Sequence, residues 1–302
     1  MSATKTKTLS IFAPAKINLY LHVTGRLDNG YHTLDSLVGF ADIGDQIDIA
    51  PAENFEFKVS GPYGGGFNAK ELDSSPHSSN IVVQAVWALA HAVKKTPDIC
   101  VTLTKNLPTA SGLGGGSSDA AAVIWGLLEW WGLPTQAHFL PELLTKLGAD
   151  VPVCLPCQPA RIRGIGDVLD TAPPMEEVSI VLVNPAKLCM TADIFRAFDG
   201  TFKPSETLPE SLTNFDDLIE FLSAQNNDLY NAACSVVPEI GNVMNALNGQ
   251  AACALSRLCG SGSTCYGLFA DEREAQSAAK SIAEENPDWW VKTGYLNRPE
   301  RY

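Results

Sequence analysis

The first sixty residues show the clearest alternation of apolar and polar positions in the chain. Within residues 11–24, every second position from Ile17 to Val23 is apolar, which is typical of a strand with one buried face. Residues 25–30 begin and end with glycine, so a hairpin turn is predicted after this strand. The β pattern continues in three further segments, residues 37–40, 45–50 and 55–60.

A helical period first appears at residues 81–93, where Asn80 is the predicted N-cap. The segment before it, residues 61–79, is rich in Gly, Ser, Pro and Asn and is predicted as a loop. Asp150 is predicted to open a short apolar strand. Between Asn80 and Asp150 the pattern also predicts a strand, a glycine-rich loop and two helices, at residues 99–105, 108–118, 119–131 and 138–147.

Pro173 and Pro174 mark the predicted boundary between two domains, residues 1–172 and residues 173–302. The second domain is predicted to hold four strands, at residues 178–184, 254–258, 264–269 and 289–295, and four helices, at residues 214–224 and 273–285 and beginning at Thr191 and Asp228. Helices and strands mix without a regular βαβ repeat. The order therefore predicts the α+β class rather than a doubly wound sheet.

The net charge of the chain argues against some classes of binding partner. The chain of 302 residues carries a formal charge of -13 and a pI near 4.8, which opposes broad attraction to nucleic acid or to an anionic membrane. No apolar run of signal-peptide length precedes Pro14, and the longest uncharged apolar stretch, residues 120–128, is too short to span a membrane, so a cytoplasmic protein is expected. A phosphorylated ligand would need local cations.

Eight cysteines in a chain of this length do not form a disulfide scaffold, and a reducing compartment is expected. Cys154 and Cys157 have the spacing of a zinc or redox motif. There is no second such pair, and no histidine lies at zinc-finger spacing, so chance spacing at a buried strand end is the favoured interpretation.

The strongest chemical signal is the segment from Pro108 to Asp119, which reads Pro-Thr-Ala-Ser-Gly-Leu-Gly-Gly-Gly-Ser-Ser-Asp and leads into a predicted helix. Four glycines permit backbone torsions and close approaches that a Cβ would forbid, so several amides can point at one anion. The positive end of the helix faces the same place. The segment predicts a phosphate-binding loop.

Other glycine motifs do not fit. No lysine follows these glycines, as a P-loop requires, and the third glycine of G-x-G-x-x-G is missing. The H-R-D and D-F-G partners of the protein-kinase loop are also absent from the sequence. A glycine-rich turn before a buried helix is the remaining plain alternative.

The segment from Pro108 to Asp119 resembles the P-x-x-x-G-L-G-x-G-S-S-[DN] signature of the GHMP kinases, whose loop wraps the triphosphate of ATP. The resemblance implies ATP as the phosphoryl donor, Mg²⁺ with ligands unassigned, and a fold with an N-terminal domain like domain 2 of ribosomal protein S5 and a C-terminal ferredoxin-like α/β sandwich. The nucleotide-binding residues that it implies are Lys105, Pro108, Thr109, Ala110, Ser111, Gly112, Leu113, Gly114, Gly115, Gly116, Ser117 and Ser118.

Two more segments match the family in the required order: residues 14–19, which read Pro-Ala-Lys-Ile-Asn-Leu, and the Gly-Ser-Gly of residues 260–262. The resemblance places Lys16 and Asp150 as the catalytic pair, with Asp150 facing the acceptor hydroxyl. Cys259 and Ser263 depart from the residues that are usual beside the Gly-Ser-Gly segment. These departures leave open whether its phosphate contacts are altered or whether Cys259 is a redox-sensitive thiol.

Residues 30–34, 148–152 and 227–229 resemble one branch of the family, which phosphorylates a cytidine diphosphate derivative of a sugar alcohol. In that branch two aromatic side chains sandwich the cytosine, as flat bases favour. The implied substrate-binding residues are Asn18, Tyr31, His32, Thr191, Phe195, Gly260, Ser261 and Gly262. A monomer or weak homodimer is expected, and a kinase for mevalonate, homoserine or a sugar and a non-catalytic nucleotide-binding protein stay as alternatives.

Overall fold

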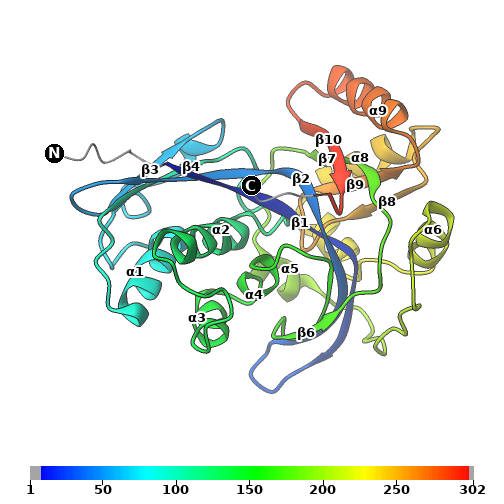
Figure 1. Cartoon of the computed structure of the whole chain (residues 1–302). Coiled ribbons are helices and arrows are strands. Elements are labelled where there is room, and N and C mark those ends of the chain that lie inside the picture. The colour runs from blue at the N-terminus through cyan, green and yellow to red at the C-terminus, as the bar shows by residue number, and fades with distance from the viewer. Residues whose placement is uncertain (1–7, 299–302) are drawn as a thin grey trace.

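The computed structural model describes residues 8–298, in which helices and strands are arranged around one extended sheet (Figure 1). The strands follow the order β3-β4-β2-β10-β7-β9-β8 across the sheet, with β1 and β5 also paired to β2, and β6 to β5. All pairings except β3 with β4 are antiparallel. The strands are β1 (Leu9–Arg26), β2 (His32–Pro51), β3 (Glu56–Ser60), β4 (Ile99–Thr104), β5 (Ala160–Gly164), β6 (Val168–Thr171), β7 (Val178–Asn184), β8 (Leu255–Leu258), β9 (Cys265–Phe269) and β10 (Trp290–Leu296).

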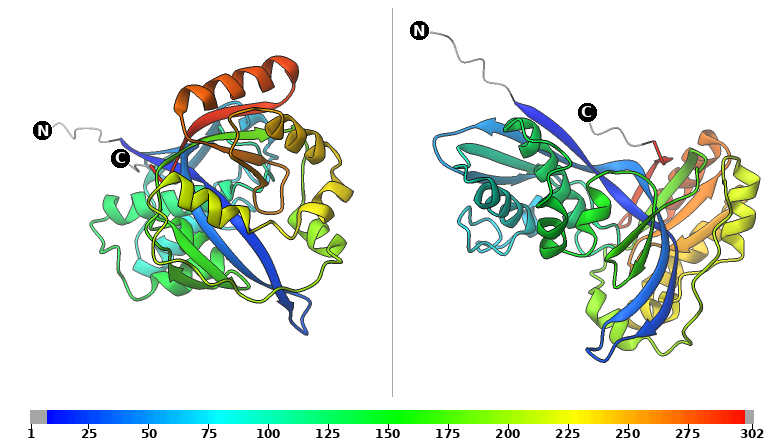
Figure 2. Two further views of the ribbon diagram at one scale, coloured as in Figure 1. Left: turned by 90° about the vertical axis from the view of Figure 1, so that its right-hand side faces the viewer. Right: turned by 60° about the horizontal axis from the view of Figure 1, so that its bottom comes forward.

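Two long strands connect the halves of the molecule. β1 and β2 form an antiparallel ribbon whose apolar positions are almost entirely buried. The alternation predicts one buried face, whereas residues 13–23 of β1 are buried on both faces of the strand. Figure 2 shows this blue ribbon running from the N-terminal half, past the C-terminal half, to a free hairpin. β2 also pairs with β10 through Leu296 and Ala41, so the ribbon belongs to both halves.

Helices cover the sheet on both sides of the ribbon. In the N-terminal half, α2 packs on β1 and against α1, and a core of buried aliphatic side chains lies between them and the sheet. In the C-terminal half, α8 and α9 pack on β7 and β9 over a second core. The helices are α1 (Ile81–Val93), α2 (Gly115–Trp130), α3 (Leu140–Leu147), α4 (Val151–Cys154), α5 (Thr191–Ala197), α6 (Phe215–Ser223), α7 (Tyr230–Val236), α8 (Glu239–Asn248) and α9 (Glu272–Glu285), with a short 3-10 turn, η1 (Gly64–Gly66).

Four local predictions were wrong. The segments predicted as separate strands at residues 37–40 and 45–50 are parts of β2, because its pairing with β1 continues across Ala41 to Gly44 with only local bulges. Residues 161–169 form a hairpin of β5 and β6 rather than a connection. Helix α8 was not predicted at all, and helix α2 begins at Gly115, four residues earlier than predicted.

The expected strand after Asp150 is also wrong. Asp150 precedes the single helical turn α4, in which Pro152 occupies one of the first two positions. Proline has a torsion suited to that position and has no amide that the helix would leave unpaired. A run of apolar residues this short does not distinguish a buried strand from a buried helical turn.

In the described part of the chain, every helix is either too short or too polar to cross a membrane. The predicted domain division between residues 172 and 173 stays a prediction.

Candidate active site

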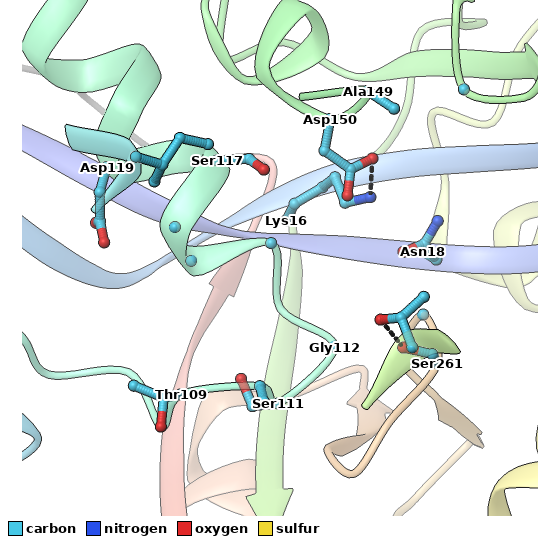
Figure 3. A pocket seen from close by; sticks show the side chains of 18 of the residues that line it. Lys16, Asn18, Thr109, Ser111, Gly112, Ser117, Asp119, Ala149, Asp150 and Ser261 are labelled. Atoms are coloured by element: carbon cyan, nitrogen blue, oxygen red, sulfur yellow. Dashed lines mark hydrogen bonds and ion pairs between the residues drawn. The ribbon is translucent and has the colours of Figure 1, made fainter. Parts of the chain in front are cut away.

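A cavity of 630 Å³ lies where the two halves meet. Its walls come from β1, the glycine-rich loop and the start of α2, the segment before α4, α5 and the Gly-Ser-Gly segment (Figure 3). Most predicted site residues line it, namely Lys16, Asn18, Lys105, Pro108, Thr109, Ala110, Ser111, Gly112, Gly114, Gly115, Gly116, Ser117, Asp150, Thr191, Phe195, Gly260 and Ser261. Leu113, Ser118, Tyr31, His32 and Gly262 are not among its lining residues.

The glycine-rich loop ends directly in the first turn of α2. The first bond of the helical ladder joins the Ser118 amide to the Gly114 carbonyl at 2.9 Å, so the amides of residues 115–117 precede that ladder. Gly112 and Gly114 adopt left-handed torsions, with φ of 80° and 62°. The loop therefore presents backbone donors and a positive helix end to the cavity, which suits a phosphate chain.

Gly112 also joins the two halves of the molecule. A Cβ on Gly112 would lie 2.3 Å from the carbonyl oxygen of Cys259 and 2.9 Å from the amide nitrogen of Gly262. Only glycine fits at this distance, so the phosphate loop and the Gly-Ser-Gly segment are in direct backbone contact. This explains why Gly262 is part of the site region without lining the cavity.

Lys16 is tied to the phosphate loop by its backbone and its side chain. Its amide donates to the Leu113 carbonyl at 2.9 Å, and its aliphatic stem lies 3.2 Å from the position of a Cβ on Gly114. Its Nζ donates to Asp150 Oδ1 at 2.8 Å, the pair drawn in Figure 3. The Lys16 side chain is 6% exposed and that of Asp150 is 39% exposed, so the carboxylate remains open to a ligand.

The charge of Lys16 is held by Asp150. Burial disfavours the ammonium form, but the charge and the hydrogen bond of Asp150 outweigh it, and the pKa of Lys16 is raised above its ordinary value. Lys16 is therefore a permanent cation beside the phosphate loop. The structure brings together these two residues from positions 134 apart in the chain.

Lys105 has a different environment, which the sequence did not reveal. Its ammonium lies between two buried carboxylates, donating to Asp119 Oδ2 at 2.8 Å and making a short bond to Asp45 Oδ2. The other oxygen of Asp45 accepts the amides of Asn106 and Leu107 at 2.6 and 2.8 Å. Lys105 thus holds together β2, the start of the phosphate loop and the second turn of α2.

The two carboxylates share one ammonium. Burial, helped by the charge of Asp45 and opposed by that of Lys105, raises the pKa of Asp119 to about 8. The charges of Asp119 and Asp45 overcome the effect of burial on Lys105 and raise its pKa. The second oxygen of Asp119, Oδ1, is buried and has no hydrogen-bond partner among the described residues. At neutral pH the group therefore retains the Lys105 cation and favours a proton on Asp119.

The Gly-Ser-Gly segment is held by polar side chains from neighbouring elements. Asn227 donates to the carbonyls of Leu258 and Gly260 at 2.9 and 2.7 Å. Ser261 Oγ lies 2.9 Å from Thr191 Oγ1 at the start of α5, and both line the cavity. Asn18 donates to Ser36 Oγ at 2.8 Å, so its amide orientation is fixed.

The cysteines do not form a reactive centre. Cys259 is fully buried, its Sγ lies 3.4 Å from the Gly112 carbonyl oxygen, and burial raises its pKa to about 11. Cys154 and Cys157 are buried as well, and no disulfide joins any described cysteines. Within residues 8–298 no group of three or more His, Cys, Asp or Glu side chains is arranged to hold a metal ion.

The aromatic residues predicted for base binding lie around the start of β2. Tyr31, at the hairpin end, is 63% exposed. The His32 ring stacks on Phe195, with centroids 5.2 Å apart and planes at 23°. The structure therefore pairs His32 with Phe195 and leaves the Tyr31 ring open to solvent.

The loop at residues 61–79, to which the sequence assigned no purpose, forms part of the cavity wall. Phe67, Glu71 and Ser79 line the cavity together with Asn80 and Ile81 at the start of α1. Phe67, Glu71 and Ser79 lie in the loop before α1, and Asn80 caps that helix by accepting the Val82 amide. No short motif marked them, because their only shared property is the fold that brings them beside the phosphate loop.

Two family models match the chain: the GHMP kinases N terminal domain over residues 80–157, and the GHMP kinases C terminal domain over residues 209–288. The chain is 42% identical to a 4-diphosphocytidyl-2-C-methyl-D-erythritol kinase of Paramagnetospirillum magneticum, over 96% of this chain and 99% of that protein. It is 44% identical to the protein of the same name from Mesorhizobium japonicum, over 92% of each.

Solved structures agree with these relatives. A crystal structure of 4-(cytidine 5'-diphospho)-2C-methyl-D-erythritol kinase superposes with a TM-score of 0.76 at 27% identity, covering 95% of this chain and 99% of that one. A homoserine kinase from Cytophaga hutchinsonii superposes with a TM-score of 0.69 at 15% identity, covering 98% and 96%, and shares the fold alone.

Proposed function

Because the chain belongs to the 4-diphosphocytidyl-2-C-methyl-D-erythritol kinases of the GHMP kinase family, we propose that it phosphorylates the 2-hydroxyl of that cytidylyl substrate with ATP. The products are the 2-phosphate and ADP, and the reaction belongs to the non-mevalonate route to isoprenoid precursors. The observation that carries the proposal is the 2.8 Å pair of Lys16 and Asp150 beside the phosphate loop.

The pair suits phosphoryl transfer. The transition state of this reaction is loose and highly charged, so alignment and charge neutralisation contribute more than strong basicity. Asp150, which is open to the cavity, orients the acceptor hydroxyl and accepts its proton late in the transfer. Lys16, held at the loop by Leu113, holds that carboxylate and offsets the charge of the moving phosphoryl group.

The phosphate chain of ATP fits the residues that are present. The amides at residues 115–117 and the positive end of α2 face the cavity, and glycine torsions keep the loop free of side chains at that point. The charged residues lining the cavity are Lys16, Lys105, Glu71, Asp119 and Asp150, and both lysines are already paired. Mg²⁺ bound to the nucleotide would supply the further positive charge that a polyphosphate needs.

The acceptor lies on the opposite side of the Lys16–Asp150 pair. Gly260 and Ser261 bring backbone amides and a hydroxyl to the cavity, and Thr191 adds a second hydroxyl 2.9 Å from that of Ser261. These groups bind the diphosphate of the cytidylyl substrate. Asn18, on the same strand as Lys16, lies between this segment and the catalytic pair in Figure 3 and contacts the bound substrate.

The base of the substrate binds at the aromatic end, against Phe195, with Tyr31 closing over it and His32 reading its polar edge. We further propose a cytoplasmic enzyme that is a monomer or weak homodimer and has no nucleic-acid or membrane partner, in accord with its charge of -13. Its domains are residues 1–172 and 173–302.

A coupled assay for ADP release tests the function directly. We expect turnover with the cytidylyl substrate and none above background with mevalonate, homoserine or galactose. Turnover with mevalonate, homoserine or galactose instead would identify that compound as the substrate. No ADP release from any of them, combined with measurable ATP binding, would leave a nucleotide-binding protein without kinase activity.

Base binding by Tyr31 and Phe195 can be tested separately. Tyr31→Ala and Phe195→Ala remove stacking surfaces worth about 1–3 kcal/mol per base, so each should raise KM for the cytidylyl substrate about 5- to 100-fold. KM for ATP should stay within about 2-fold, because neither aromatic residue belongs to the phosphate loop. Equal changes in both KM values would contradict the assignment of this end to the base.

A further inference from the structure

Four aromatic rings form one cluster at the start of β2. Besides stacking on Phe195, the His32 ring meets the rings of Phe198 and Phe202 edge-on, with centroids 5.8 and 6.4 Å away. Phe198 and Phe202 stack on each other at 6.4 Å, with planes at 26°. The imidazole is thus bounded by one ring on its face and by two that make edge contacts with it.

The segment that carries these phenylalanines is held in place at both ends. It follows α5 directly, and a Cβ on Gly200 would lie 2.7 Å from the Phe198 ring, so the backbone is packed tightly on that ring. The Lys203 amide donates to the Val23 carbonyl at 3.0 Å, and its ammonium pairs with Asp228 at 2.8 Å. The cluster is therefore anchored to β1, the strand that carries Lys16.

The surroundings of His32 favour the neutral form of its ring. Burial first, and then the guanidinium of Arg26 across the β1–β2 ladder, lower the pKa of His32. The other nearby cations are already paired, Arg196 of α5 with Asp193 and Lys203 with Asp228. A neutral imidazole offers one donor and one acceptor nitrogen, whereas the charged ring offers two donors.

We propose that Phe198 and Phe202 are positioning residues that hold the His32 imidazole on Phe195 and exclude water from it. The ring nitrogen that faces the base is then held in fixed orientation toward a base edge that itself has an acceptor and an amino group. This inference rests on the proposed function, since the base end is where it acts. It extends that function to two residues that do not line the main cavity and that no sequence motif marks.

The first test uses the enzyme without substrate. The imidazole of His32 is titrated by NMR in the wild type, in Phe202→Ala and in Phe198→Leu. Phe202 is 47% exposed, so its removal leaves the core intact. Both variants should move the pKa of His32 upward, toward that of a solvated histidine. The matched control is Val168→Ala, an exposed apolar residue on β6, which should leave the titration unchanged.

The second test is kinetic. Because an edge-to-face aromatic contact contributes modestly, Phe202→Ala should raise KM for the cytidylyl substrate about 3- to 10-fold. KM for ATP and kcat should be unchanged, and the acid limb of kcat/KM for the cytidylyl substrate should move to higher pH together with the imidazole titration. Phe202→Tyr, which restores a ring, should return both quantities toward wild type.

An imidazole titration that is the same in both variants and the wild type would overturn the proposal, and so would equal increases in the two KM values. The titration needs no substrate, so its failure is separate from failure of the proposed function. Turnover with another acceptor alone would refute the function while leaving the positions of Phe198 and Phe202 around His32 intact.

Discussion

Two buried lysines line the same cavity, but their surroundings differ. Lys105 lies between Asp45 and Asp119, both almost fully buried, and these bonds connect three elements of the fold. Lys16 has one partner, Asp150, whose side chain is 39% exposed. Lys105, which is bonded to two buried acidic side chains, stabilises the elements that carry the phosphate loop. Lys16, whose partner is partly exposed, is available for chemistry. Mutations at the two sites should therefore change different quantities.

The largest effect is expected on kcat, from a change in the Lys16–Asp150 pair. Asp150→Asn keeps the shape of the side chain but removes its charge and basicity, and loss of a proton acceptor lowers kcat by about 10²- to 10⁴-fold. The Kd for ATP should change little, because Asp150 is partly exposed and lies off the loop backbone. Glu142→Gln on the neighbouring helix α3 is the control. Turnover near wild type in Asp150→Asn would remove its assigned role.

Substitution of Lys105 should mainly change the stability of the fold. Lys105→Met leaves the buried Asp45 and Asp119 without their cation, which costs about 3–5 kcal/mol of unfolding free energy. Lys146→Met breaks a solvent-exposed pair with Glu142 and should cost about 0–1 kcal/mol. Denaturant unfolding of both variants measures the difference. Equal losses would show that the Lys105 group is not a stabilising centre.

The pH dependence of stability distinguishes the two sites further. The pKa of Asp119 is raised to about 8 by burial, far above its value in the unfolded chain, so the folded state binds an extra proton between these two values. Its contribution to stability is complete below the unfolded pKa and is lost as pH rises toward 8. Urea midpoints from pH 5 to pH 9 should therefore fall less steeply in Asp119→Asn than in the wild type. Parallel curves would contradict the raised pKa.

The smallest effect is expected at Cys259, next to the Lys16 strand. Its thiol is buried with a pKa of about 11, so at pH 8 a thiol reagent should label the partly exposed Cys100 and not Cys259. Cys259→Ser keeps a donor toward the Gly112 carbonyl, and kcat/KM should stay within about 3-fold of wild type. Mass spectrometry of the native labelled protein checks the first point, and rapid labelling of Cys259 would overturn it.

The contrast between the lysines also separates what the sequence could predict from what it could not. The phosphate loop is a contiguous motif, and the α+β fold and the resemblance to the GHMP kinases are confirmed by the matching family models and relatives. Asp45 and Asp119 reach Lys105 from 60 and 14 positions away, and no spacing rule marks such a group. Phe198 and Phe202 meet His32 for the same reason, through folding of distant segments.

The prediction of secondary structure from the sequence failed where local signals were weak. Asp150 precedes a helical turn of four residues, too short for a helical period to show, and the strand predicted there came from its apolar letters alone. The glycines at positions 115 and 116 have poor helix propensity, so the sequence placed the start of α2 too late, although packing on β1 maintains the helix there.

The continuity of β2 bears on how the enzyme takes up its substrates. This strand of twenty residues pairs with β1, β4 and β5 and also reaches β10 of the C-terminal half. Rotating one half against the other would shear that ladder, and Gly112 would separate from the backbone of Cys259. We therefore expect ligand entry and product release to depend on the loop at residues 61–79, which lines the cavity, rather than on rotation of one half against the other.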